Sequence, residues 1–305
     1  MIGRIVEIAS DGRHLSVKRG FMLVEADGVE AARIPLDDIA VVLANAHGLS
    51  YSNNLLVTLA ERGVMVVLCG PNHAPAAWLW PVAGHHAQTE RMLAQARIGR
   101  PLSKRLWQEL VVAKVTQQAA MLNIAGKTSG GVAALARKVR SGDPENIEAQ
   151  AARRYWPLLM GRDFRRERAA PGVNALLNYG YTVLRAATAR AIAAAGLHPS
   201  LGLHHRTRTD PLCLASDLME PFRPLVDIAA YRLIQDGADD LTPEVKSVLA
   251  QVPSIDMRTP RGVTPLSTCL ERLAQSLARA CEGGGPRLEL PSSPLPLDAA
   301  RLGRT

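Results

Sequence analysis

The sequence predicts an α+β protein in which a small β-rich N-terminal domain precedes a larger all-α catalytic domain. Two observations indicate this division. Residues 1–84 contain short apolar runs separated by turn signals, which is the pattern of strands and hairpins. Residues 85–282 carry apolar side chains at helical spacing. Residues 283–305 are rich in Gly, Pro and Ser, so we expect a flexible tail there.

Strands are expected wherever the N-terminal domain carries a short apolar run. These runs are IGRIVEI, FMLVEA, ARIPL, IAVVLA and VMVVLCG, with a turn at Asp27-Gly28. One helix interrupts them, because Ser52 is a candidate N-cap and Gly63 follows the last turn as a C-cap does. Its stripe of leucines is expected to pack on the sheet.

Helices are expected throughout the second domain. Leu106 and Leu110 mark a long one that ends near Gly126. Another runs from Val173 to Ala195, and its alanines permit close packing. Further helical stretches cover residues 144–157, 217–236, 242–251 and 265–281.

Composition excludes several classes of protein. A chain of 305 residues with 47% apolar content can bury a core, so disorder along its whole length is excluded. Four widely spaced cysteines without a C-x-x-C motif favour a reducing cytoplasm, and no run approaches the roughly 18 apolar residues that a membrane span needs. With 36 Lys+Arg against 28 Asp+Glu, the net charge of +8 indicates a polyanionic partner. An ordinary soluble protein from a lineage with basic proteins is the alternative.

The segment LGLHHRTRTDPLCLASDLMEPFRPLVD, residues 201–227, concentrates potential metal ligands. Asp217 and Glu220 are three residues apart, so on a helix both carboxylates project from one face. Pro221 is expected to distort the turn that carries them. A preceding loop would bring His204 or His205 to the same ion, and one nitrogen with oxygen ligands suits Mn²⁺ or Mg²⁺ better than zinc.

These acids also have an interpretation without a metal. Asp217 would cap the helix, where a carboxylate complements the helix dipole. Glu220 and Asp227 would each pair with Arg223 at the i+3 and i+4 spacings. Spacing alone leaves both interpretations open.

A second candidate lies in SGDPENIEAQAARRYWPLL, residues 141–159. Asp143 followed by Pro144 predicts an N-cap and the first helical residue, which places Glu148 in the second turn. The face of Glu148 carries alanines and Tyr155, and no cation stands at i+3 or i+4. A buried carboxylate needs a partner, and a metal is one. The alternative is a solvated glutamate at the helix edge.

Arginines flank these acids. Arginine suits phosphate through its planar fork of donors, so acids that hold a metal within a rim of arginines are typical of a nuclease. A solvated arginine face is the alternative. The candidate rim consists of Arg153, Arg154, Arg162, Arg165, Arg166, Arg168, Arg206 and Arg208, with a lesser basic patch at Lys104 and Arg105 near Trp107.

Three motifs together resemble one family. NIEAQAARRYW, PGVNALLNYGYTVLRAATARAIAAAGLHPSLGLHH and LASDLMEPFRPLVD are similar to the universal CRISPR-associated adaptation endonuclease and integrase, as are IPLDDIAVVL and LLVTLAERGVMVVLCG in its β domain. The resemblance covers nearly the whole chain up to the tail. The short length and the form of the last motif are most similar to type II systems.

The resemblance implies a function and a site. It implies a homodimer, dimerised through the β-rich domain, that joins a small second adaptation protein and binds a short DNA duplex, the spacer precursor. A 3′ hydroxyl of this DNA would attack a phosphodiester at the edge of a CRISPR repeat. The metal ligands it implies are Glu148 from N-x-E, His205 from G-x-x-H and Glu220 from D-x-x-[DE], with Asp217 beside them.

The DNA contacts expected beside this site are those of five arginines, Arg153, Arg162, Arg165, Arg166 and Arg206. Two rival functions remain open. One is a hydrolytic metallonuclease in DNA repair, which has the same metal site without strand transfer. The other is a nucleic-acid scaffold in which the acids only form salt bridges.

Overall fold

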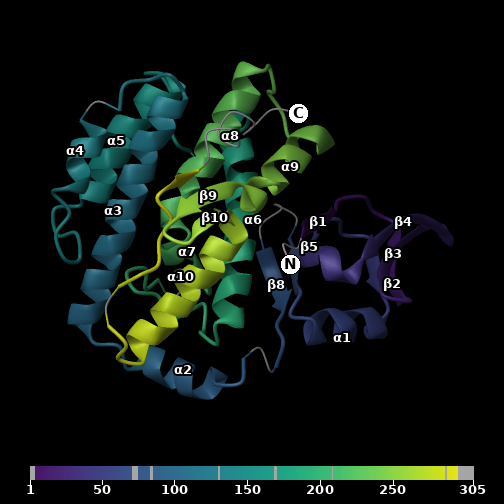
Figure 1. The fold of residues 1–305 in the computed structure, drawn as a ribbon. Helices are drawn as coiled ribbons and strands as arrows, with labels where there is room; N and C mark the ends of the chain where they lie inside the picture. Colours follow the sequence, from purple (N-terminus) through teal and green to yellow (C-terminus); the bar gives the residue numbers. More distant parts are fainter. Residues whose placement is uncertain are drawn as a thin grey trace. The chain divides into compact units, whose positions relative to one another are not determined.

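The computed structural model describes residues 4–70, 75–82, 85–129, 131–167, 170–207, 209–285 and 287–294 (Figure 1). The chain divides into two compact units, Met1–His86 and Ala87–Thr305. The first unit contains two β-sheets, and the second is mostly helical. The predicted α+β class is confirmed.

Two four-stranded sheets form the N-terminal unit. In one, with the order β4-β3-β2-β6, the hairpin strands are antiparallel and β6 runs parallel to β2. In the other, β1, β5 and β7 are parallel and β8 is an antiparallel edge strand. The strands are β1 (Arg4–Ile8), β2 (Arg13–Lys18), β3 (Phe21–Ala26), β4 (Val29–Pro35), β5 (Ile39–Ala44), β6 (Leu49–Tyr51), β7 (Met65–Cys69) and β8 (Pro75–Leu79).

The apolar runs correctly predict β1, β3, β4, β5 and β7. Sequence patterning missed β2, β6 and β8. The sequence RHLSVK of β2 carries four charged or polar residues, and β6 has only three residues, so neither forms an apolar run. Both are recruited by pairing with neighbouring strands.

Helix α1 (Asn53–Glu61) begins where the sequence predicts. The Ser52 hydroxyl accepts a hydrogen bond from the Leu55 N–H at 3.2 Å, which satisfies an otherwise unpaired donor of the first turn. The buried side chain of Leu55 packs in one cluster with Met22 of β3 and Val42 of β5. This single apolar core therefore joins α1 to both sheets.

Two long helices organise the second unit. α3 (Arg100–Ile124) contacts α4, α5 and α8, and α6 (Val173–Ala194) contacts α8, α9 and α10 (Figure 1). The remaining helices are α2 (Gln88–Ala96), α4 (Val132–Ala136), α5 (Ile147–Met160), α7 (Cys213–Leu218), α8 (Arg223–Gln235), α9 (Pro243–Ala250), α10 (Leu266–Cys281) and the 3₁₀ turns η1 (Leu36–Asp38, in the first unit), η2 (Glu220–Phe222) and η3 (Val252–Ser254). None of the helices described here is long and apolar enough to cross a membrane.

The sequence predicted an all-α second domain, but the second unit also contains a small β-sheet. β9 (Asp256–Thr259) and β10 (Gly262–Pro265) form a hairpin, and β11 (Ser293–Pro294) pairs with the other side of β9. These strands have four residues or fewer, which is too short for a recognisable alternation of apolar and polar residues. The prediction of a purely helical domain was therefore wrong.

Residues 287–294 pack against the helical unit, although the composition predicts a flexible tail there. The Leu288 side chain is only 7% exposed, and its N–H donates a hydrogen bond to Glu109 Oε2 of α3 at 2.9 Å. One buried leucine and the pairing of β11 with β9 thus hold a segment whose composition indicates disorder. Residues 295–305 lie outside the described residues.

Candidate active site

Glu148 is positioned by the capped start of α5. Asn146 is the N-cap, with φ +52°, and its Oδ1 accepts the N–H of Ala149 at 3.3 Å. The carboxylate of Asp143 accepts the N–H groups of Ile147 at 2.8 Å and Glu148 at 3.0 Å. The helix therefore begins at Ile147 and places Glu148 in the first turn, whereas the sequence predicted a start at 144 with Asp143 as the N-cap position. Asp143 still satisfies the first helical donors from outside the helix.

Glu220 lies where the predicted distortion occurs. α7 ends at Leu218, a single 3₁₀ turn carries Glu220 and Pro221, and α8 starts at Arg223. Proline lacks an N–H and its ring crowds the preceding turn, so the helix cannot continue through this point. The break buries Glu220, which is 3% exposed.

Lys114 of α3 joins the two glutamates. Its Nζ lies 2.6 Å from Glu148 Oε1 and 2.5 Å from Glu220 Oε2, and the Lys114 side chain is 11% exposed. Arg223 Nε lies 3.1 Å from Glu220 Oε1. Two carboxylates and two cations thus balance in a largely buried site, and the predicted pairing of Arg223 with Glu220 is confirmed.

The pKa values follow from this balance. Burial alone would lower the pKa of Lys114, but the carboxylates of Glu220 and Glu148 outweigh it and hold the pKa above its ordinary value. Burial alone would raise the pKa of Glu220, but Arg223 and Lys114 outweigh it and hold the pKa below its usual range. Lys114 and Glu220 are therefore both charged at neutral pH.

Asp217 holds the loop that carries the histidines. Its Oδ2 accepts the N–H groups of Leu203 at 2.6 Å and His204 at 3.0 Å, and its Oδ1 accepts the N–H of His205 at 3.2 Å. Oδ1 also lies 2.5 Å from His205 Nδ1. Asp217 lies near the end of α7, so the interpretation as a cap at the start of a helix is wrong. With no exposed surface and both oxygens accepting hydrogen bonds, Asp217 orients the histidine loop, and its role as a metal ligand stays a prediction.

The two neighbouring histidines have different surroundings. The His204 ring stacks on Trp107 with centroids 4.2 Å apart and planes 6° apart, whereas the His205 ring stands edge-on to Trp107 at 5.8 Å. The hydrogen bond to Asp217, and then the charges of Asp217, Glu220 and Glu148, raise the pKa of His205. Since Asp217 engages Nδ1, Nε2 is the ring nitrogen left for a ligand. These observations favour His205 as the imidazole of the site.

The donor set of the site fits a divalent cation. Two carboxylates and one imidazole nitrogen are ligands that Mn²⁺ and Mg²⁺ accept, and the carboxylates already converge on one positive charge. No three His, Cys, Asp or Glu side chains within the described ranges are close enough together to hold a metal. The reason is local, because the ammonium of Lys114 lies between Glu148 and Glu220. A divalent cation bound to both glutamates would have to displace it.

A polar layer lies beneath the site. Asp227 is 2% exposed, accepts a hydrogen bond from the Tyr181 hydroxyl and lies close to that of Tyr155. The guanidinium of Arg223 stacks over the Tyr181 ring at 4.7 Å. Burial raises the pKa of Asp227 to about 7, against the opposing hydrogen bonds of the tyrosines. Arg223 thus pairs directly with Glu220 and contacts the ring of Tyr181, whose hydroxyl donates to Asp227. This indirect connection replaces the predicted ion pair between Arg223 and Asp227.

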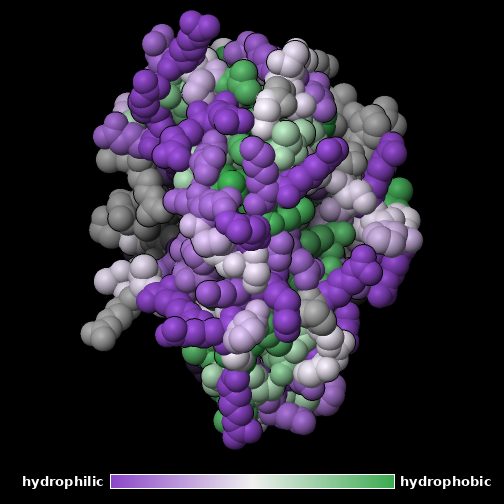
Figure 2. Space-filling view, turned by 90° about the vertical axis from the view of Figure 1, so that its left-hand side faces the viewer, coloured by the Kyte–Doolittle hydropathy of each residue, from purple (hydrophilic) through white to green (hydrophobic). Residues whose placement is uncertain are grey.

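The predicted DNA-contacting arginines fall into two groups. Arg165 and Arg166 already form hydrogen bonds within the chain. Arg165 donates to the carbonyl of Arg162 at 2.9 Å, and Arg166 donates to Asn174 and Asn178 of α6 at 2.8 and 2.6 Å. The guanidiniums of the exposed residues Arg153, Arg162 and Arg206 form no ion pair within the described part of the chain. The face that carries α3, α4 and α5 is largely hydrophilic (Figure 2). Arg168 and Arg208 lie outside the described residues.

Sequence reasoning missed Lys114. A signal for it exists, because Lys114 follows the buried residues Leu110 and Val111 by four and three positions and therefore lies on the buried face of α3. A lysine on such a face needs an anionic partner. The signal does not say which acids supply it, since Glu148 and Glu220 are distant in the sequence.

Known proteins share both sequence and fold with this chain. The family model described as CRISPR associated protein Cas1 matches residues 6–248. The CRISPR-associated endonuclease Cas1 of Neisseria meningitidis serogroup C (strain 8013) is 36% identical over 292 residues, which cover 93% of this chain and 94% of that protein.

Solved structures share the fold at low sequence identity. A casposase bound to integration product has a TM-score of 0.79 and 18% identity, over 94% of this chain and 92% of that chain. A Cas6-RT-Cas1–Cas2 complex contains a chain with a TM-score of 0.74 and 18% identity, over 94% of this chain and 36% of that chain. At these identities the likeness concerns the fold alone.

Proposed function

The chain belongs to the Cas1 family of CRISPR-associated proteins, and on this premise we propose that it is a metal-dependent DNA endonuclease and integrase. It inserts short foreign DNA fragments into a CRISPR array. The observation that carries the proposal is the convergence of Glu148 and Glu220 on one buried cation beside His205. Salt bridges alone do not account for it, because the cost of removing these charges from water offsets most of their attraction, so a scaffold gains little stability from burying them.

Glu148, Glu220 and His205 through Nε2 are the proposed ligands of Mg²⁺ or Mn²⁺. A bound divalent cation supplies Lewis acidity toward a phosphodiester and neutralises charge that develops during its attack. Asp217 fixes the imidazole by its hydrogen bond to Nδ1, as carboxylates do for many metal-bound histidines. Arg223 compensates Glu220 and keeps its carboxylate ionised.

The proposed reaction is transesterification. The 3′ oxygen of the captured DNA forms a bond to phosphorus at the edge of a repeat while the bond to the displaced strand breaks, so the number of phosphodiesters is unchanged. Water as the nucleophile gives hydrolysis at the same site. The exposed guanidiniums of Arg153, Arg162 and Arg206 are proposed to contact DNA phosphates, which carry no sequence information.

The proposed partners follow from the family. They are the spacer precursor duplex, the CRISPR repeat, a second copy of this chain and a small second adaptation protein. The casposase bound to integration product and the Cas1–Cas2 complex, which share this fold, support DNA and protein partners of these kinds. We further propose a cytoplasmic location and a type II system, the latter from the short length and the LASDLMEPFRPLVD motif.

A strand-transfer assay tests the proposal. The chain and its small partner are incubated with a 3′-hydroxyl duplex and a supercoiled repeat plasmid, in Mn²⁺ or in EDTA. We expect joined product that requires the metal, that disappears in Glu148→Gln and that persists in the control Glu90→Gln, an exposed glutamate of α2. Metal-dependent nicking without joining would instead identify a hydrolytic nuclease. DNA binding with neither product, unchanged by Glu148→Gln, would identify a scaffold.

A further inference from the structure

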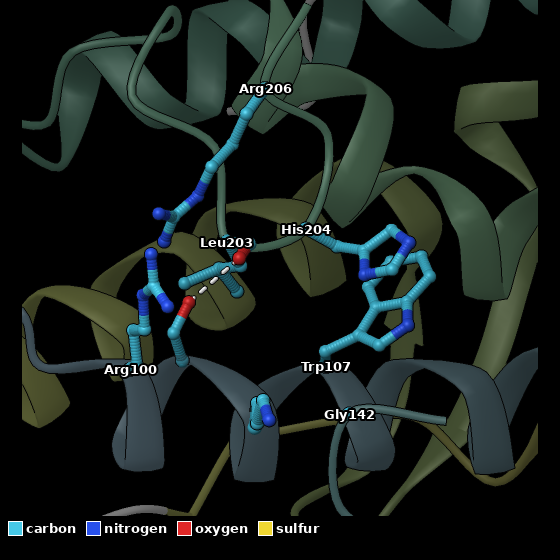
Figure 3. Close-up of a pocket in the computed structure, with 8 residues that line it drawn as sticks. Arg100, Trp107, Gly142, Leu203, His204 and Arg206 are labelled. Carbon is cyan, nitrogen blue, oxygen red and sulfur yellow. Dashed lines mark hydrogen bonds between the residues drawn. The ribbon is translucent and has the colours of Figure 1, made fainter. Parts of the chain in front are cut away.

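A cavity lies next to the candidate active site. It has a volume of about 270 Å³ and opens between the start of α3, the turn at Gly142 and the segment that precedes His205 (Figure 3). It shares a wall with the active site, because Trp107 stacks on His204 and also contacts the edge of the His205 ring. Its lining consists of Arg100, Ser103, Lys104, Trp107, Gly142, Leu203, His204 and Arg206.

The charge of this cavity is entirely positive. Arg100, Lys104 and Arg206 line it, and no carboxylate does. Within the described part of the chain, the side chains of these three residues form no ion pair. The guanidinium ends of Arg100 and Arg206 point toward one another across the mouth (Figure 3). Like charges that converge without a counter-charge repel, and an anion between them relieves that repulsion.

The walls of the cavity are held by hydrogen bonds and close packing. The buried Ser103 hydroxyl donates to the carbonyl of Leu203 at 2.7 Å, which ties α3 to the histidine loop (Figure 3). The Gly142 N–H donates to the carbonyl of Lys104 at 2.9 Å. A Cβ at Gly142 would lie 2.9 Å from Lys104 Cγ, and its φ of +80° disfavours other residues. The cations therefore project from a constrained frame.

We propose that this cavity binds a backbone phosphate of the DNA strand that reacts at the neighbouring site, between the guanidiniums of Arg100 and Arg206 and the ammonium of Lys104. The inference rests on the proposed function. His204 and His205 are consecutive, so their Cα atoms lie about 3.8 Å apart. A strand whose phosphate lies beside His205 therefore has a neighbouring phosphate within reach of the cavity.

The test compares DNA binding by two double variants that each remove two positive charges. The variant Arg100→Gln/Arg206→Gln removes both guanidiniums from the mouth of the cavity. The control, Arg137→Gln/Arg258→Gln, alters two exposed arginines of the same unit that do not line the cavity. The probe is a fluorescent 3′-hydroxyl duplex in EDTA, so that no reaction occurs. The fluorescence anisotropy of the probe is measured while protein is titrated into it, at several NaCl concentrations between 50 and 200 mM.

One lost phosphate contact is expected to reduce the slope of log K against log[salt] by about 0.7 to 0.9. We expect this reduction for the cavity variant alone. A second set of probes carries a single uncharged methylphosphonate at successive positions near the 3′ end. At one position, the methylphosphonate should weaken the binding of the probe to the unmodified chain. The same probe should bind the cavity variant no more weakly than the unmodified DNA does. Equal slopes for the two double variants, or no such position, would overturn the proposal.

Two further outcomes separate this proposal from the function on which it rests. Strand transfer by the unmodified chain together with an unchanged slope refutes the phosphate site and leaves the integrase function intact. A reduced slope with a sensitive methylphosphonate position supports the phosphate site even if no joined product forms. A last comparison adds inorganic phosphate as a competitor. If phosphate weakens the binding of every probe equally, including the probe whose sensitive position is uncharged, the cavity binds free anions and the DNA contact is refuted.

Discussion

Replacing Lys114 with methionine removes the ammonium between Glu148 and Glu220 while keeping a chain of similar length. The Lys114 and Glu220 side chains are 11% and 5% exposed, so their charges have little access to water. Removing one partner of a buried ion pair costs about 3 to 5 kcal/mol. Glu148 is 24% exposed and Glu220 retains Arg223, so we expect a loss near the lower end, about 3 kcal/mol.

This loss is measurable as a melting temperature. For a domain of this size, 1 kcal/mol corresponds to about 2 to 4 °C, so Lys114→Met should lower the Tm of the helical unit by about 6 to 12 °C in EDTA. Mn²⁺ should raise the Tm of the variant by more than that of the unmodified chain, because the ion no longer competes with an ammonium for the carboxylates. Calorimetry gives the Tm, and isothermal titration gives the Mn²⁺ affinity.

The matched control is Lys127→Met, which removes an exposed lysine just beyond the C-terminal end of α3. It should change neither quantity. An unchanged Tm of Lys114→Met in EDTA would show that the ammonium does not stabilise the pair of carboxylates. If Mn²⁺ raises the Tm of Lys114→Met and of the unmodified chain equally, the reasoning that the carboxylates bind the metal in place of the ammonium is refuted.

Three other predictions concern stability and order. Asp217→Ala removes the acceptor of three backbone N–H groups, of which that of Leu203 is buried, and should cost at least about 1 to 3 kcal/mol, the cost of one buried donor left unpaired; urea unfolding measures this, and a loss under 1 kcal/mol would contradict it. The pKa of Asp227 is about 7 in the folded chain and 3.8 in the unfolded chain, so between these pH values the folded state holds a proton that the unfolded state has lost. Its contribution to the unfolding free energy therefore falls as pH rises, by about 1.4 kcal/mol per unit up to pH 7, and is constant above. Urea unfolding from pH 5 to 8 should show a shallower decline for Asp227→Asn, and parallel curves would refute the raised pKa. Leu288→Ala, at a 7% exposed position, should destabilise the helical unit by about 2 to 4 kcal/mol, whereas an unchanged midpoint would show that residues 287–294 do not pack.

The acids of the site were predictable from local sequence, and their roles were not. A spacing of three residues indicates that Asp217 and Glu220 share a face only while the helix is regular. Pro221 breaks that helix, so Glu220 turns to Lys114 and Asp217 turns to the loop of His205. The distinction depends on backbone N–H groups of the histidine loop, which no side-chain pattern encodes.

Long-range contacts explain the other differences. The partners of Lys114 lie 34 and 106 positions further along the chain, and a helical period does not identify them. Similarly, Leu288 is one apolar residue in a segment rich in Gly, Pro and Ser, and it is ordered by Glu109 of α3 and by strand pairing. Composition describes what a segment does alone, and here the rest of the unit supplies its partners.

The ammonium of Lys114 also determines how a reaction can be started. Because Lys114 and Arg223 together balance the charges of the two glutamates, the carboxylates stay together without a divalent ion, and the site does not need to assemble around one. Protein and DNA can therefore be equilibrated in a chelating buffer and synchronised by a single addition of Mn²⁺. The first turnover observed in this way would report the exchange of one cation for another, free of any delay for folding of the site.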